Sequence, residues 1–130
     1  MKRLLICDDE PHIVEGLRYL LRQPDRQIEV ASNGAEALER IRAAMPDLLI
    51  LDVMMPKMSG PELMAVLRAS EQTRHLPVVI LTAKGQAQDA AMAQEMWGAT
   101  VMGKPFEPRR LRELVASILE GEKCPTPSCE

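Results

Sequence analysis

The sequence predicts an α/β domain in which a parallel sheet carries helices on both faces. Short apolar runs alternate five times with segments whose apolar residues recur at helical spacing. This alternation is typical of βα units joined by right-handed crossovers. The third apolar run, residues 48–51, is aliphatic throughout, as expected of a strand buried on both faces of a parallel sheet.

The chain length and composition fit one ordinary domain. With 130 residues the chain can fill a single core but not two cores of that size. The sequence is 46% hydrophobic and 27% charged with a net charge of -3, which excludes a disordered chain and a basic nucleic-acid binder. We expect the domain to span residues 1–121, followed by a flexible tail or linker stub at 122–130.

Neither a targeting segment nor a disulfide framework is indicated. The apolar run at residues 4–7 meets charge again at Asp8, so it is too short for a signal peptide or a membrane span. We therefore expect a cytoplasmic protein with no membrane contact and no direct nucleic-acid contact. The three cysteines are an odd number, with Cys7 in an apolar run and Cys124 and Cys129 in the tail, so Cys7 is interpreted as a core residue.

The first half of the chain contains two predicted βα units. Residues 4–7 form the first strand, and Pro11 opens a helix whose buried side is expected to carry Ile13, Leu17, Leu20 and Leu21. Residues 28–31 form a short second strand. Asn33 and Glu36 have the spacing of a helix cap, and the following helix should bury Leu38, Ile41 and Met45 before Pro46 ends it.

The second half continues the alternation. After the strand at 48–51, a capping pattern at 59–62 opens a helix, and residues 77–81 form the fourth strand. A weaker, alanine-rich helix is expected over 86–96 and a fifth strand over 99–102. The last helix precedes Gly121 and has apolar residues at regular helical spacing: Leu111, Leu114, Val115, Ile118 and Leu119.

Polar residues stand at the ends of four predicted strands, namely Asp8 and Asp9, Asp52, Thr82, and Lys104. The carboxyl ends of parallel strands meet at one edge of the sheet, where ligands bind in open α/β folds. Three carboxylates gathered there repel one another unless one is protonated or a cation joins them, and an all-oxygen site suits Mg²⁺. A threonine hydroxyl and a lysine facing the cation would complete a pocket for a phosphoryl group. The chemistry predicted is phosphorylation of a carboxylate.

Each of these residues also has a purely structural interpretation. An aspartate after a strand often begins a turn, and acids before Pro11 favour the positive end of a helix dipole. Thr82 would then satisfy backbone groups at a strand end, and Lys104 would be a solvated lysine. Chance placement of all five at strand ends is improbable, which favours the site.

These motifs resemble the receiver domain of two-component response regulators, the CheY-like superfamily. The matching residues are the Asp8-Asp9 pair, the segment 51–56 with Gly60, the pair Thr82-Ala83, and the segment 104–106, covering about residues 3 to 120. The resemblance implies a flavodoxin-like (βα)5 doubly wound sheet of order 2-1-3-4-5, which the family itself exemplifies.

The resemblance also implies a role for each acidic residue. Asp52 would be the phosphoacceptor, taking a phosphoryl group from a sensor histidine kinase or a phosphotransfer protein. Mg²⁺ would be bound directly by Asp9 and Asp52, by Asp8 directly or through water, and by the backbone carbonyl of Met54.

The phosphoryl-binding and switch residues would be Thr82, Ala83 and Lys104. Three positions before the lysine the family usually carries Tyr or Phe, whose rotation reports phosphorylation, whereas this chain has Val101. The aromatic half of the usual switch is therefore missing, and we expect weaker coupling between the site and the distal surface.

The function expected from the sequence is that of a phosphoacceptor switch. It would catalyse only its own phosphorylation and dephosphorylation, rather than act as an enzyme on other substrates, and would signal to an unknown downstream protein or output domain. It would work alone or as part of a longer regulator, and homodimers are common in the family. Two rivals stay open: a receiver-like binding module that signals without phosphorylation, and a Mg²⁺ phosphohydrolase, for which the second acid expected two positions after Asp52 is replaced by Met54.

Overall fold

Five parallel strands form one sheet in the computed structural model, which describes residues 2–52, 60–82, 100–103 and 107–119. The strand order is β2-β1-β3-β4-β5, as predicted. The strands are β1 (Lys2–Cys7), β2 (Arg26–Ala31), β3 (Leu48–Asp52), β4 (Val78–Thr82) and β5 (Thr100–Gly103).

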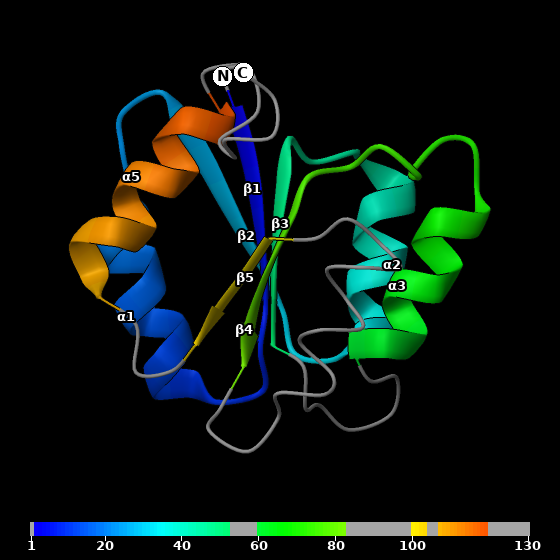
Figure 1. The fold of residues 1–130 in the computed structure, drawn as a ribbon, viewed down its shortest axis with the longest axis horizontal. Coiled ribbons are helices and arrows are strands. Elements are labelled where there is room, and N and C mark those ends of the chain that lie inside the picture. The colour runs from blue at the N-terminus through cyan, green and yellow to red at the C-terminus, as the bar shows by residue number, and fades with distance from the viewer. Residues whose placement is uncertain (1, 53–59, 83–99, 104–106, 120–130) are drawn as a thin grey trace.

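Helices cover both faces of the sheet (Figure 1). On one face lie α1 (Pro11–Leu21) and α5 (Pro108–Leu119), and on the other α2 (Gly34–Ala43) and α3 (Gly60–Ala69). The doubly wound arrangement expected from the sequence is thereby confirmed. The helix predicted over 86–96 and the tail predicted at 122–130 lie outside the described residues.

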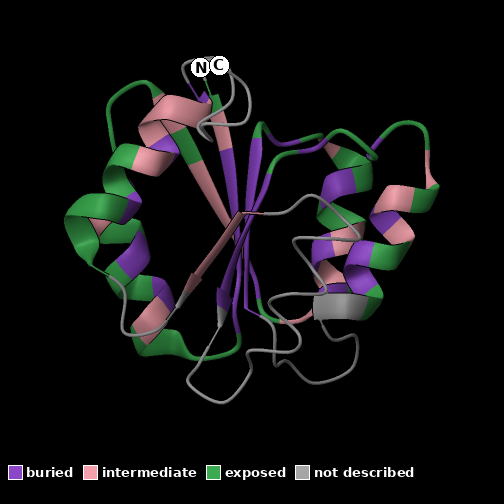
Figure 2. Ribbon diagram, viewed as in Figure 1, coloured by how far each residue is buried: buried purple, intermediate pink, exposed green. Residues whose placement is uncertain are grey.

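Two apolar layers, one on each face of the sheet, form the core. The central strands β1, β3 and β4 are mostly buried between these layers, whereas the outer strands β2 and β5 are mostly half-buried (Figure 2). Alternate residues of a strand enter opposite layers: in β1, Leu5 packs with α2 and α3, whereas Leu4 packs with α1 and α5. This two-sided burial explains why β3 is aliphatic up to Leu51.

Some element boundaries and buried faces differ from those predicted. Strands β1 and β2 each begin two residues earlier, because Lys2 pairs with Arg26 across the sheet and such pairing does not require apolar side chains. In α1 the fully buried residues are Val14, Leu17 and Leu21, while Ile13 and Leu20 are only half-buried.

The predicted end of the second helix was wrong. Helix α2 ends at Ala43 because Ala44 has an extended backbone, with φ -154° and ψ 112°. Met45 therefore lies outside the helix and is 43% exposed, although it was expected in the core.

The start of α2 matches the predicted cap. Asn33 Oδ1 accepts a hydrogen bond from the Glu36 amide at 2.9 Å, and Glu36 Oε1 accepts from the backbone N–H and the hydroxyl of Ser32, both at 2.8 Å. These bonds from Ser32 lower the pKa of Glu36. The cap fixes the chain as it leaves β2 beside the carboxyl edge of the sheet.

The turn between α3 and β4 is held by Thr73. This residue is buried, and its hydroxyl donates to the carbonyl oxygen of Leu67 at 2.6 Å. Its carbonyl oxygen accepts from Arg68 Nη1 at 3.2 Å. Leu67 lies in the last turn of α3, so the bond satisfies a helix-end carbonyl that has no partner within the helix.

Candidate functional site

The strand register aligns the polar residues predicted for the site. Cys7 pairs with Leu51 across β1 and β3, so Asp8 and Asp52 come next on neighbouring strands. Thr82 is the last residue of β4 and pairs with Gly103 on β5. The structure thus brings the ends of β1, β3, β4 and β5 to one edge, as expected of a parallel sheet.

Three carboxylates meet at this edge. Asp8, Glu10 and Asp52 each offer an oxygen, and these oxygens lie within 4.8 Å of one another. Asp8 is 2% exposed and Asp52 is 6% exposed, while Glu10 is exposed. We call these three side chains the carboxylate cluster.

Backbone and side-chain bonds fix the loop that carries Asp8. The Asp8 amide donates to the carbonyl oxygen of Ala31 at 3.1 Å, which ties the end of β1 to the end of β2. Asp8 Oδ1 accepts from the Glu10 amide at 3.0 Å, an Asx-type turn. The carbonyl of Glu10 in turn accepts from the amides of Ile13 and Val14 at the start of α1.

Glu10 was not among the predicted site residues, and Asp9 is not a member of the cluster. The Asp9 side chain is exposed. Glu10 stands at the N-cap position of α1 with an extended backbone, φ -100° and ψ 110°. Its carboxylate also lies 4.0 Å from His12 Nε2. The signal in the sequence is the run of three acids before Pro11, but the sequence does not show which of the three point toward Asp52.

Burial and the nearby acids act together on Cys7. Burial, followed by the negative charges of Asp8 and Asp52, raises the pKa of Cys7 to about 12. The thiol donates to the carbonyl oxygen of Asn33 at 3.4 Å. Cys7 is therefore a protonated core residue, as predicted, and not a nucleophile at neutral pH.

The donor chemistry of the cluster fits a hard divalent cation. Carboxylate oxygens are the ligands that Mg²⁺ and Ca²⁺ prefer, and Mg²⁺ needs only one or two of them because it retains several waters. Two buried carboxylates so close together repel each other, and a bound cation would remove this cost. Asp8, Glu10 and Asp52 are therefore the described residues that could hold a metal.

The remaining predicted residues are placed only in part. Val101 on β5 is half-buried and packs against the apolar layer under α2 and α3. Met54, Ala83 and Lys104 lie outside the described residues. Among the helices that the structure describes, none is long and apolar enough to cross a bilayer.

Comparison with known proteins agrees with this architecture. The sequence model of the family described as "Response regulator receiver domain" matches residues 4–116. The regulatory protein PhoP for alkaline phosphatase synthesis of Bacillus subtilis is 38% identical over 129 residues, covering 99% of this chain and 53% of PhoP. The DNA-binding response regulator MtrA of Mycolicibacterium smegmatis is 37% identical, covering 90% of this chain and 49% of MtrA. The chain thus spans about half the length of these relatives.

Solved structures show the same fold. A putative response regulator from Chloroflexus aurantiacus is 38% identical with a TM-score of 0.82, and the match covers 92% of this chain and 98% of that one. The receiver domain of a histidine kinase from Syntrophus aciditrophicus is 31% identical with a TM-score of 0.84, covering 98% and 96% of the two chains. The chain belongs to the receiver domain family of two-component response regulators.

Proposed function

We propose that this receiver domain accepts a phosphoryl group on Asp52 from a phosphohistidine of a sensor histidine kinase or a phosphotransfer protein. The observation that supports this most strongly is the position of Asp52. It is the last residue of β3, it is nearly buried, and its carboxylate lies within 4.8 Å of those of Asp8 and Glu10. Asp8 shares the burial and the cluster, but it follows β1 in the loop before α1, whereas Asp52 is itself the last residue of a strand.

The proposed transfer is a displacement at phosphorus. A carboxylate oxygen of Asp52 forms the new P–O bond while the P–N bond to the donor imidazole breaks, and the imidazole leaves as a neutral ring after it takes up a proton. Hydrolysis ends the signal: water attacks the phosphorus of the acyl phosphate on Asp52, which restores the carboxylate and releases inorganic phosphate. Positioning and charge stabilisation are the main demands of such a step. The buried, backbone-fixed edge of the sheet meets the first demand.

We assign the cation site to the acids around Asp52. Asp8 and Asp52 form its buried part, Asp9 supplies the third carboxylate as the family resemblance implies, and the Met54 backbone carbonyl completes the set. When bound, Mg²⁺ would neutralise charge on the transferring phosphoryl oxygens. The proximity of Glu10 to Asp8 and Asp52 makes it the rival for the place of Asp9.

Phosphoryl recognition and the switch are assigned to residues on β4 and β5. Thr82 would donate to one phosphoryl oxygen, Lys104 would pair with another, and the Ala83 segment would move with Thr82. Val101 stands where the aromatic switch residue is usual, and its half-buried packing supports a weakened coupling between Asp52 and the distal surface.

The protein would act on itself and not on an external substrate, and its output would be a surface recognised by a downstream protein or an output domain. We propose a cytoplasmic setting for it. The relatives PhoP and MtrA are by name a transcriptional regulator and a DNA-binding regulator. A DNA-directed output is therefore the first downstream class to test, with DNA contacted outside this domain.

The test is the intact mass of the protein after incubation with a small phosphodonor such as acetyl phosphate. We expect one phosphoryl adduct that requires both Mg²⁺ and Asp52. Asp52→Asn is the matched variant, because it keeps the size of the side chain and removes the nucleophile. A binding module without phosphorylation would give no adduct on the folded wild-type protein, and that result would overturn the proposal.

Two further variants separate the candidates for the third carboxylate. We expect Asp9→Asn to raise the Mg²⁺ concentration needed for half-maximal adduct at least tenfold, and Glu10→Gln to raise it less than threefold. Both variants retain the size of the side chain. The reverse order would assign the place to Glu10.

A further inference from the structure

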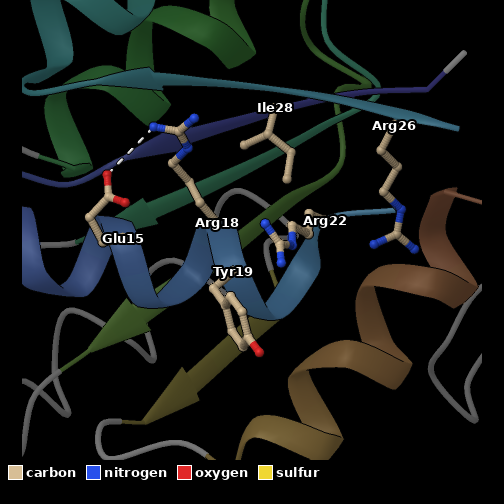
Figure 3. Close-up of a pocket in the computed structure, with 6 residues that line it drawn as sticks. All are labelled: Glu15, Arg18, Tyr19, Arg22, Arg26 and Ile28. Carbon is tan, nitrogen blue, oxygen red and sulfur yellow. Dashed lines mark hydrogen bonds and ion pairs between the residues drawn. The ribbon is translucent and has the colours of Figure 1, made fainter. Parts of the chain in front are cut away.

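A groove rich in arginine lies at the end of α1, away from the carboxylate cluster. Its first part is a cavity of about 310 Å³ between α1 and β2, lined by Glu15, Arg18, Tyr19, Arg22, Arg26 and Ile28 (Figure 3). A second cavity of about 250 Å³ adjoins it next to α5. This cavity is lined by Gln23, Arg26, Arg109, Arg112, Glu113 and Ala116. Arg26 lines both cavities, and we call the two together the arginine groove.

The groove carries more positive charge than its own acids neutralise. Arg18 pairs with Glu15 and Arg109 with Glu113, each at 3.5 Å along its own helix. Within the part of the chain that the structure describes, Arg22, Arg26 and Arg112 form no ion pair. A chain with a net charge of -3 therefore concentrates uncompensated positive charge in one place.

The side chains are also ordered by local contacts. The Arg22 guanidinium lies 4.8 Å from the centroid of the Tyr19 ring. Arg26 Nη1 donates to the carbonyl oxygen of Leu21 at 2.7 Å, which satisfies the C-terminal end of α1. Because a guanidinium has five N–H donors, these contacts hold the arginines in place and leave donors for a ligand.

Tyr19 points to a protein partner. It is 72% exposed, which makes it the more exposed of the two large hydrophobic residues that lie on the surface in the described part of the chain. Tyrosine and arginine are the residue types that dominate binding energy at protein interfaces, because they offer a large rigid contact area and directed donors. An exposed tyrosine between Arg18 and Arg22 has the composition of such a contact.

The distribution of charge in the arginine groove favours a ligand with spaced carboxylates over a nucleic acid. Glu15 and Glu113 lie within the two cavities, and they would repel a nucleic acid, which carries a charge at every backbone unit. Carboxylates match the planar guanidinium bidentately and can be spaced to avoid these two acids. We propose that the arginine groove docks an acidic, extended segment of a partner protein.

The groove and the carboxylate cluster lie at opposite ends of the sheet. Arg26 begins β2 and pairs with Lys2 at the start of β1, whereas Asp8 follows the end of β1. A partner bound in the groove thus leaves Asp52 open, so docking and phosphorylation can be measured independently.

The experiment measures binding of a fluorescent ten-residue peptide of alternating glutamate and serine, the glutamate peptide, to the 130-residue chain by anisotropy. We expect the combined variant Arg22→Glu/Arg26→Glu to weaken binding at least tenfold. Arg112→Glu should weaken peptide binding at least threefold. Arg112 is exposed on α5 and does not contact the end of α1 that Arg26 caps, so this variant tests the groove without altering that cap. The matched control is Arg42→Glu, an exposed helical arginine on the other face of the sheet, which should bind as wild type does.

Circular dichroism and the phosphoryl adduct on Asp52 establish that each variant is folded and keeps its active edge. No binding of the glutamate peptide to wild type at low salt would overturn the proposal. Equal losses of peptide affinity in Arg42→Glu and Arg112→Glu would also overturn it, because they would show that the peptide is attracted non-specifically to positive charge. Tighter binding of a ten-nucleotide oligothymidine than of the peptide would overturn it in favour of a nucleic-acid surface.

Discussion

At the carboxyl ends of the strands, Asp8 and Asp52 are buried with oxygens within 4.8 Å of each other. At the opposite end Thr73 is buried with its hydroxyl bonded, and the arginines of the groove are exposed except for the half-buried Arg26. The same sheet supports both ends. Like charges that are buried cost free energy unless a cation joins them, but exposed like charges are screened by water and salt. The carboxyl end is thus suited to chemistry and the opposite end to stability and docking.

The largest effect on stability is expected at Thr73. Thr73→Val keeps the shape of the side chain but leaves the Leu67 carbonyl with only the long hydrogen bond from the Ser70 amide at 3.4 Å, which should lower the free energy of unfolding by about 2 kcal/mol. Urea unfolding measures the change. Thr73→Ser keeps the hydroxyl and should lose less. A loss in Thr73→Val no larger than in Thr73→Ser would show that the bond does not hold this end of the molecule.

A smaller effect of opposite sign is expected at Asp8. With EDTA present, Asp8→Asn should raise the free energy of unfolding by about 1 kcal/mol, because it removes one of two buried negative charges and keeps the oxygen that accepts from the Glu10 amide. Urea unfolding with EDTA and with Mg²⁺ tests this. Mg²⁺ should stabilise wild type more than the variant, since a ligand stabilises the state that binds it. Destabilisation of the variant in EDTA would contradict the charge argument.

The smallest effect on stability is expected at Glu36. This acid lies beside the same edge of the sheet, and its carboxylate accepts hydrogen bonds from Ser32. Its pKa is lowered in the folded protein by the bonds from Ser32, so its contribution to stability is present above the unfolded pKa and is lost as pH falls through the folded pKa. The side chain is 36% exposed, so we expect a contribution of about 0.5 kcal/mol or less.

Unfolding of wild type and Glu36→Gln between neutral pH and about pH 3 measures this term. The difference in stability between the two proteins should shrink on acidification. A difference that stays constant with pH would mean that the bonds from Ser32 do not depend on the charge.

The order of elements and the edge that carries the site could be predicted because they follow from local patterns. Aliphatic runs such as 48–51, the cap at Asn33, and polar residues at strand ends depend on neighbouring residues alone. Five βα units restrict the topology further, since parallel crossovers have one hand. The sequence alone thus predicts that Asp8, Asp52 and Thr82 lie at one edge of the sheet.

The contacts between residues distant in the sequence could not be predicted from local patterns. Sheet pairing extended β1 and β2 into polar residues, and side-chain direction in the loop before α1 put Glu10, not Asp9, beside Asp52. The arginine groove arises because α1, β2 and α5 meet in space and not because their arginines are adjacent in the sequence. Hydrophobic periodicity specifies which side of an element is buried, but the positions of exposed charges are set by how the elements pack.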